Sequence, residues 1–275
     1  MKPTSGKNSD SLIKRLSVEM GVMGARKRAL DTHVNVFNNL QGLARGAAVY
    51  ITSLINQTLS SQDLFSLMLS GGSTPRAVYT LLGSKAFAPQ IDWAKVHIFW
   101  GDERCVPPDH SDSNYCMARE TLLERVPLPG SNVHRICGEL APEVAALHYE
   151  GELVAFFGER SGEPRFDLIM LGMGDDGHIA SLFPGSPALE EKSRLVSAVK
   201  HDQPPPPLID RVSVTLPLIN AARQVMLIIT GEAKARRVAE AFSEADKLPS
   251  LPVQRVKPIQ GEVIWLLDEA ATQEL

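Results

Sequence analysis

The chain has 275 residues, a formal net charge of −4 and an apolar fraction of 44%. This composition is ordinary for a soluble globular protein, and a mildly negative whole offers no field that would attract nucleic acid. No apolar run approaches the roughly 20 residues that span a bilayer, so we expect neither a membrane nor a nucleic-acid partner. Residues 1–33 predict a polar extension that need not be ordered, rather than a signal peptide, with the domain over residues 34–275.

Hydrophobic periodicity predicts alternating helices and strands beyond the extension. Apolar side chains at three- and four-residue spacing indicate helices, and short apolar runs indicate strands. In chain order the segments are a helix within Val36–Leu59, a strand at Leu64–Ser70, a helix at Pro75–Leu82, a strand at Val96–Trp100, helices at Asn114–Val126 and Pro142–Phe157, a strand at Phe166–Gly172, a β-rich segment at Arg211–Ile219, a strand at Gln224–Thr230, a helix at Glu232–Phe242 and a strand at Gly261–Asp268. This alternation predicts one α/β domain with a mostly parallel sheet and flanking helices. The prolines of His201–Pro207 predict a surface loop.

The cysteines indicate the redox environment. Cys105, Cys116 and Cys137 give an odd count, with no CxxC pair and no histidine at a zinc-finger spacing. This argues against a disulfide framework and against a structural zinc site. We therefore expect a reducing compartment, with the cytoplasm as the default.

The first candidate site is LSGGSTPRAVY, Leu69–Tyr79, which joins a predicted strand to a predicted helix. Gly71 and Gly72 let the backbone approach a ligand, Ser73 offers a hydroxyl, and the helix start presents free N–H groups at its positive dipole end. The stretch matches neither GxxxxGK[ST] nor GxGxxG, so a dinucleotide is not expected. Phosphate binding and a merely capped turn are equal alternatives at this point.

Three charged residues, Asp102, Glu103 and Arg104, directly follow the predicted strand Val96–Trp100 and its glycine. In open α/β sheets, ligands bind beyond the carboxyl ends of strands, so these charges lie where a site would form. By themselves they fit a solvated loop with a local ion pair better than a site.

The stretch MLGMGDDGHIASLFPG, Met170–Gly185, places Asp175, Asp176 and His178 beyond another strand. Three ligands so close in sequence, without a partner histidine motif, make a poor tetrahedral shell, so we expect no metal. A histidine with a natural pKa of about 6.5, oriented by a carboxylate, suits general-base catalysis. We interpret His178 as a candidate base and Asp176 as its partner, with Gly177 permitting the bend.

Two more cations are candidates for an anionic ligand. Lys234 lies in the first turn of a predicted helix, where a cation opposes the helix dipole unless an anion is bound. Arg211 opens the β-rich segment, and its alternative is a surface arginine beside Asp210. The chain has no GxSxG elbow and no cysteine with an adjacent base motif, so a hydrolysis here would use activated water.

These segments, in this order, resemble the 6-phosphogluconolactonase family, which belongs with the glucosamine-6-phosphate deaminases and isomerases. The matching stretches are LSGGSTP, WGDERCVPPDHSDSN, FDLIMLGMGDDGHIASLFPG, RVSVTLPLIN and ITGEAKA, and they span roughly Val34 to Ala270. The resemblance implies a single-domain, Rossmann-like α/β fold, a monomer, and no metal or organic cofactor. It also implies hydrolysis of 6-phospho-D-glucono-1,5-lactone to 6-phosphogluconate, the second step of the oxidative pentose phosphate pathway.

The resemblance also implies roles for single residues. His178 would be the general base and Asp176 its partner. The phosphate and the sugar would be held by Gly71, Gly72, Ser73, Arg76, Asp102, Arg104, Arg211 and Lys234.

Two departures favour a lactonase over a deaminase. Deaminases continue DGHIA with an Asn-Glu-Pro pattern, whereas Ser181–Pro184 follows here, and they carry Asp-Glu-Tyr where this chain has Asp102–Arg104. A non-catalytic sugar-phosphate sensor of the same fold is the other alternative. The presence of His178 and the lack of a helix-turn-helix pattern in residues 1–33 argue against it.

Overall fold

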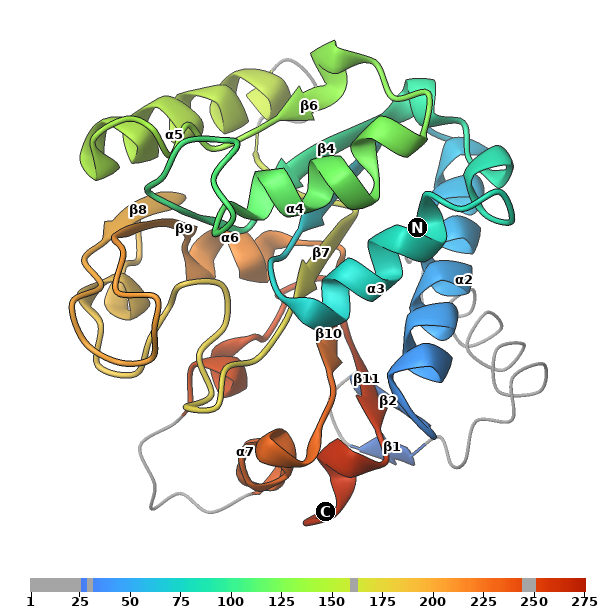
Figure 1. Ribbon diagram of the computed structural model, residues 1–275, viewed down its shortest axis with the longest axis vertical. Coiled ribbons are helices and arrows are strands. Elements are labelled where there is room, and N and C mark those ends of the chain that lie inside the picture. Colours follow the sequence, from blue (N-terminus) through green and yellow to red (C-terminus); the bar gives the residue numbers. More distant parts are fainter. Residues whose placement is uncertain (1–25, 29–31, 159–162, 244–250) are drawn as a thin grey trace.

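Seven parallel strands and one antiparallel strand form the central sheet (Figure 1). The structure is a computed structural model that describes residues 26–28, 32–158, 163–243 and 251–275. The strand order is β1-β2-β11-β10-β7-β3-β4-β6. In this order the bounds are Arg26–Arg28, Thr32–Phe37, Glu262–Asp268, Gln224–Ile229, Leu168–Leu171, Phe65–Leu69, Val96–Trp100 and Val133–His134. Of these strands, β1 alone is antiparallel to its neighbour.

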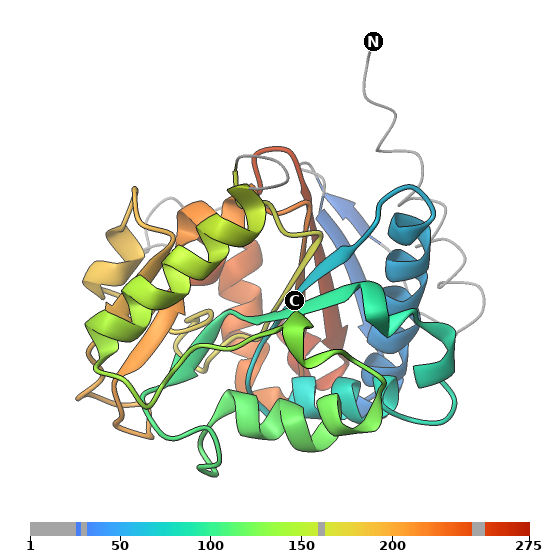
Figure 2. The ribbon, with the colours of Figure 1, turned by 90° about the horizontal axis from the view of Figure 1, so that it is seen from above.

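Helices cover both faces of the sheet, with α2 on one side and α5 and α6 on the other (Figure 2). Within the described residues the α-helices are α2 Leu40–Leu59, α3 Ser73–Leu82, α4 Asn114–Thr121, α5 Pro142–Gly158, α6 Leu216–Ala221 and α7 Ala235–Phe242. Short 3-10 helices lie at Ala88–Gln90, Trp93–Lys95, Leu123–Arg125, Gly130–Asn132, Pro187–Glu190, Glu232–Lys234, Pro252–Arg255 and Ala270–Thr272. Because both faces are covered, every residue of β3 and β7 is buried, and such strands read as continuous apolar runs.

The predicted strands and most of the predicted helices are confirmed, and so is the mostly parallel α/β sheet. The hydroxyl of Ser113 caps α4 by accepting the N–H of Cys116 at 3.0 Å, at the helix start that the sequence indicated. Residues 201–207 contain no helix or strand and are mostly exposed, as their prolines predicted.

A second, antiparallel sheet in the order β5-β9-β8 continues from the end of β4. Its strands are Asp102–Arg104, Arg211–Val214 and Val196–Val199. Gly101 alone separates β4 from β5, and its carbonyl accepts the N–H of Val214 at 2.8 Å. The register pairs Arg104 with Arg211, so this sheet brings together two cations that are far apart in sequence.

The sequence did not predict the first two strands of the chain. The helical pattern was assigned from Val36, but α2 begins at Leu40, and Thr32–Phe37 forms β2, which pairs with β11. The apolar face of α2 extended the helix prediction backward over Val36 and Phe37, the last two residues of this six-residue strand. Arg26–Arg28 is also a strand, so the boundary at residue 33 lies inside the first strand pair. Residues 1–25 of the expected extension lie outside the described residues.

The β-rich prediction for Arg211–Ile219 was half wrong. Strand β9 ends at Val214, and Leu216–Ala221 is the helix α6. Branched apolar residues suggested a strand, but Pro217 in the first helical turn is a residue that begins helices well.

Candidate active site

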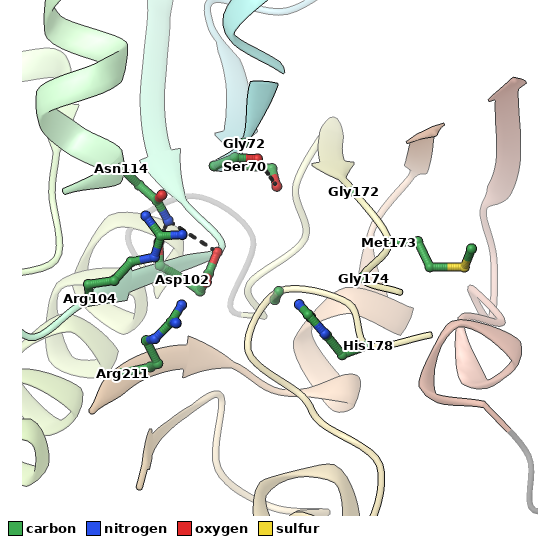
Figure 3. Close-up of a pocket in the computed structure, with 12 residues that line it drawn as sticks. Ser70, Gly72, Asp102, Arg104, Asn114, Gly172, Met173, Gly174, His178 and Arg211 are labelled. Atoms are coloured by element: carbon green, nitrogen blue, oxygen red, sulfur yellow. Dashed lines mark hydrogen bonds between the residues drawn. The ribbon is translucent and has the colours of Figure 1, made fainter. Parts of the chain in front are cut away.

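A cavity of about 190 Å³ opens beyond the carboxyl ends of β3, β4 and β7, where open α/β sheets bind ligands (Figure 3). Its lining residues are Ser70, Gly71, Gly72, Asp102, Arg104, Asn114, Gly172, Met173, Gly174, His178, Ala180 and Arg211. His178 lies on one side, and Asp102, Arg104, Arg211 and Asn114 lie on the other (Figure 3). Segments that are distant in sequence therefore form one site.

The imidazole of His178 is oriented by Asp176. Its Nδ1 lies 2.6 Å from Oδ1 of Asp176, and the same oxygen accepts the backbone N–H of His178 at 3.1 Å. Burial acts to raise the pKa of Asp176, but the hydrogen bonds and charge of His178 outweigh burial and hold this pKa below its usual value. With Nδ1 engaged, Nε2 is the ring nitrogen left for a ligand, which is the arrangement of an oriented general base.

Two glycines make room for this pair. A Cβ on Gly174 would lie 2.1 Å from Nδ1 of His178 and 2.8 Å from Oδ1 of Asp176. Gly177 has a φ of +85°, a left-handed conformation that glycine adopts without strain. Its N–H donates to the carbonyl of Gly174 at 3.0 Å, and the N–H of Gly174 donates to the carbonyl of His178 at 2.9 Å. The loop therefore closes on itself around the histidine.

A tight turn follows His178 and carries strain. Ala180 has a φ of +47°, which is unusual for a residue with a Cβ, and it lines the cavity. Ser181 is fully buried, and its hydroxyl donates to Oδ2 of Asp102 at 2.7 Å, while its N–H donates to Oγ of Ser213 at 3.2 Å. These contacts attach the loop after β7 to both strands β5 and β9.

The expectation of a solvated loop at Asp102–Arg104 was wrong, because these residues form strand β5, in which Asp102 and Glu103 are buried. The alternation of a strand separates its three charged side chains. Asp102 and Arg104 line the cavity, whereas Glu103 points the other way, as successive residues of a strand do. The buried carboxylate of Glu103 accepts the N–H groups of Asn114 and Tyr115 and the hydroxyl of Ser113, at 2.7 to 3.0 Å. Burial raises the pKa of Glu103 despite these hydrogen bonds. Glu103 thus fixes the start of α4 rather than contacting a ligand.

Arg104 and Arg211 bring two guanidinium groups to the cavity. Arg211 is buried and donates to two carbonyl oxygens of the preceding loop. Burial lowers the pKa of Arg211, and Asp102 opposes this shift, but a guanidinium stays protonated in proteins. Nη1 of Arg104 donates to the carbonyl of Asp112 at 2.6 Å, and its buried Nε has no acceptor among the described residues.

The glycine-rich turn forms the remaining wall. A Cβ on Gly71 would lie 2.0 Å from Oδ1 of Asn114, so only glycine fits beside the first residue of α4. Gly72 has a φ of +105° and precedes α3, whose first amides have no side-chain cap and no acidic neighbour in the first turn. Tyr79 of α3 holds the turn through two 2.8 Å hydrogen bonds with the backbone N–H and carbonyl of Ser70.

Several predicted residues lie outside the cavity lining. Ser73 is exposed, and Arg76 is exposed and lies 4.0 Å from Glu120. The ammonium of Lys234 pairs with the carboxylate of Asp175. Asp176 lies behind His178, as a partner rather than a ligand. The structure therefore brings together Gly71, Gly72, Asp102, Arg104, His178 and Arg211, and leaves Ser73, Arg76 and Lys234 beside the site.

The sequence missed other residues of the lining, notably Ser70, Asn114, Met173 and Ala180. Asn114 donates from Nδ2 to the carbonyl of Asp102 at 2.9 Å and to its Oδ1 at 3.4 Å. The only local signal for Asn114 was its place directly after a capping serine. Asp102 and Asn114 belong to one motif, but their spacing of 12 positions does not show that the two side chains meet.

The described residues contain no group of three or more metal-ligating side chains arranged to hold a metal ion. They also contain no helix that combines the length and apolar character needed to cross a bilayer. The three cysteines are free thiols. The monomeric state and the cytoplasmic location stay predictions.

A model of the glucosamine-6-phosphate isomerases/6-phosphogluconolactonase family matches residues 38–265. The chain belongs to this family. A 6-phosphogluconolactonase of Synechocystis sp. is 41% identical over 244 residues, which are 88% of this chain and 98% of that protein. A protein of Oryza sativa subsp. indica described as probable 6-phosphogluconolactonase 3, chloroplastic, is 39% identical over 87% of this chain and 75% of its own length. The family predicted from the motifs is confirmed.

Solved structures of family members share the fold. The 6-phosphogluconolactonase from Trypanosoma cruzi superposes with a TM-score of 0.79 at 28% identity, over 92% of this chain and 99% of that chain. A monomeric glucosamine-6-phosphate deaminase superposes with a TM-score of 0.72 at 19% identity, over 88% of this chain and 99% of that chain. At that identity the deaminase indicates a common fold alone.

Proposed function

We propose that the chain hydrolyses 6-phospho-D-glucono-1,5-lactone to 6-phosphogluconate. The observation that carries this proposal is a histidine held by Asp176 across one cavity from the guanidinium groups of Arg104 and Arg211. One base and an anion-binding wall are what a phosphorylated lactone needs. The lactonases among the relatives support the choice of substrate.

The phosphate and sugar are held by the wall that faces His178. The uncapped start of α3 after Gly72 offers amide donors and a positive dipole end to the phosphate. Arg104 and Arg211 supply charge, and Arg104 Nε has no protein acceptor among the described residues. Anchoring the phosphate fixes the lactone carbonyl relative to His178 and turns binding energy into orientation.

His178 moves the protons of the reaction. Neutral Nε2 takes a proton from water as the water oxygen bonds to C1 of the lactone. The C1–O bond of the ring then breaks, and the imidazolium returns its proton to the leaving ring oxygen. The products are a carboxylic acid and a hydroxyl group, so atoms and charges balance without a covalent enzyme intermediate. Asp176 keeps Nδ1 protonated and the ring aligned throughout.

Ser73, Arg76 and Lys234 belong to this proposal as phosphate ligands of the outer rim. Lys234 would exchange Asp175 for the phosphate when substrate binds, because both partners are anions and the carboxylate of Asp175 is largely exposed. Arg76 lies in the first turn of α3, and its present partner, Glu120, is distant and exposed.

A deaminase is the competing activity on the same fold. The deaminase pattern places a glutamate directly before the proline of the motif, whereas this chain has Phe183 there, with its ring centroid 4.5 Å from that of His178. An apolar ring at this position supplies no second acid or base. The absence of ammonia release from glucosamine 6-phosphate is therefore expected.

The deciding experiment generates the lactone in situ with glucose-6-phosphate dehydrogenase and follows 6-phosphogluconate with and without the protein. Spontaneous hydrolysis is subtracted. We expect His178→Ala to lower kcat about 10²–10⁴-fold, the contribution of a general base. A fully active His178→Ala protein would exclude this role, and a parent protein with no rate above background would exclude the lactonase.

A further inference from the structure

Phe183 lies between two histidine rings. Its ring centroid is 4.5 Å from that of His178, at an angle of 50°, and 4.3 Å from that of His201, to which it is nearly parallel at 14°. Aromatic pairs at these separations attract each other beyond simple burial. His178 is thus held by Asp176 through Nδ1 and by Phe183 at the ring.

His201 is only 5% exposed and takes no part in the proposed chemistry. Its Nε2 lies 2.6 Å from the carbonyl oxygen of Pro205, which can only accept, so Nε2 carries the proton. Its backbone N–H donates to Oδ1 of Asp210 at 3.0 Å. His201 is therefore fixed to the loop that it opens.

The same loop also holds Arg211. Nη2 of Arg211 donates to the carbonyl of Pro207 at 3.0 Å, and Nε donates to the carbonyl of Ile209 at 2.9 Å. Four consecutive prolines fix φ along Pro204–Pro207, so the carbonyls that meet His201 and Arg211 have little freedom. One restrained loop thus contacts a cavity arginine directly and the candidate base through Phe183.

We propose that Phe183 is a positioning residue for His178 and that His201 and the loop Asp202–Pro207 hold Phe183 in place. This inference rests on the proposed function, since it assigns a task within that reaction. An imidazole fixed at one nitrogen can still turn about that hydrogen bond, and a ring packed on it removes this freedom. The loop therefore aligns Nε2 with the water that it activates.

The first test compares Phe183→Leu, which removes the ring, with Phe183→Tyr, which keeps it. Phe242→Leu is the matched control, because Phe242 packs on Trp265 in a different part of the protein. We expect Phe183→Leu to lower kcat about 10-fold or more with KM within about twofold, because misplacing a catalytic group costs turnover rather than binding. Phe183→Tyr and Phe242→Leu should keep most of kcat.

The second test separates the two contacts of His201. His201→Phe keeps a stacked ring and loses the hydrogen bond to Pro205, and His201→Gln keeps an N–H donor and loses the ring. We expect His201→Gln to lower kcat more than His201→Phe. Equal losses in both, or a loss that tracks the melting temperature across all variants including Phe242→Leu, would overturn the proposal in favour of general destabilisation.

A spectroscopic readout keeps the test independent of the substrate. A histidine Nδ1 proton shared with a carboxylate gives a far-downfield proton resonance, which His178→Ala assigns by its loss. We expect this resonance to persist in Phe183→Tyr and Phe242→Leu and to broaden or vanish in Phe183→Leu. If the parent protein hydrolyses no lactone, the proposed function fails while this signal still decides the positioning. An unchanged signal and unchanged kcat in Phe183→Leu overturn the inference.

Discussion

The hydroxyl oxygens of Thr74 and Thr230 lie 2.8 Å apart, so the start of α3 is hydrogen-bonded to the residue that follows β10. Thr230 precedes the short 3-10 turn Glu232–Lys234. The glycine-rich turn and the segment with Lys234 are therefore neighbours, although 156 positions separate the two threonines. This contact supports the proposed phosphate role of Lys234, because it places the segment that carries Lys234 beside the glycine-rich turn.

Lys234→Ala should raise KM for the lactone and weaken competition by inorganic phosphate, with kcat little changed. The physical reason is the loss of one cation from the phosphate rim, and steady-state kinetics with added phosphate measure it. Lys95→Ala serves as the control, since Lys95 pairs with Asp92 at 3.7 Å on the surface. Unchanged KM and unchanged phosphate inhibition would mean that Lys234 only neutralises Asp175.

Ser181→Ala should lower kcat/KM about 10-fold and reduce the free energy of unfolding by roughly 1–3 kcal/mol, because a buried carboxylate loses a hydrogen bond. The lost contact is the 2.7 Å bond to Oδ2 of Asp102. Denaturant unfolding and kinetics on the same samples measure both effects. Ser84→Ala is the matched control, because the buried Oγ of Ser84 has no partner among the described residues. Similar behaviour of the two variants would contradict a structural link between the loop and β5.

Gly174→Ala should abolish most activity while the protein still folds. The added methyl group would meet Nδ1 of His178 at 2.1 Å, so the ring must turn away from Asp176. A misplacement of about 1 Å at a catalytic group costs roughly 100-fold in rate. Gly130→Ala, where a Cβ meets nothing within 4 Å, should keep full activity. Circular dichroism checks the fold, and wild-type kcat in Gly174→Ala would refute the geometry described for this pair.

Asp176 makes the stability of the protein depend on pH at the acid end. Its folded-state pKa is lowered from the usual 3.8, so its contribution is complete above about pH 4 and is lost as pH falls through the folded value. Asp176→Asn should therefore be less stable than the parent at pH 5, and this difference should shrink at pH 3. Urea unfolding at both pH values tests the sign. A gap that widens at pH 3 would contradict the assignment.

The parallel strands β3, β4 and β7 were predictable, because the central sheet is buried on both faces and leaves apolar runs in the sequence. Strand β5 was not, because its three charged residues fit a solvated loop when taken alone. The base and its partner were predictable too, since Asp176 and His178 lie two positions apart and their contact is local. The sequence singled out Gly71, but it did not show why glycine is required there, because Asn114 approaches Gly71 from another motif.

Contacts between motifs set the limit of the sequence prediction. Nothing near Ser181 indicates that its hydroxyl meets Asp102, and nothing near Glu103 indicates that it holds α4 while its neighbours face the cavity. The helix α6 was missed for a different reason. Its apolar residues suit a strand and a buried helix equally. Pro217, which favours a helix start, was included in the predicted β-rich segment.

The turn at Ala180 fixes one wall of the cavity through contacts on both of its sides. His178 and Ser181 flank one strained reversal, closed by the 2.8 Å hydrogen bond from Leu182 to Ile179 and tied to two strands. His178 and Ser181 are therefore restrained together. The facing wall is held as well, because Nη1 of Arg104 donates to the carbonyl of Asp112 at 2.6 Å and Arg211 donates to two carbonyls of its loop. A cavity held on both sides favours a ligand that fits its present shape, because little of its lining has to be ordered on binding.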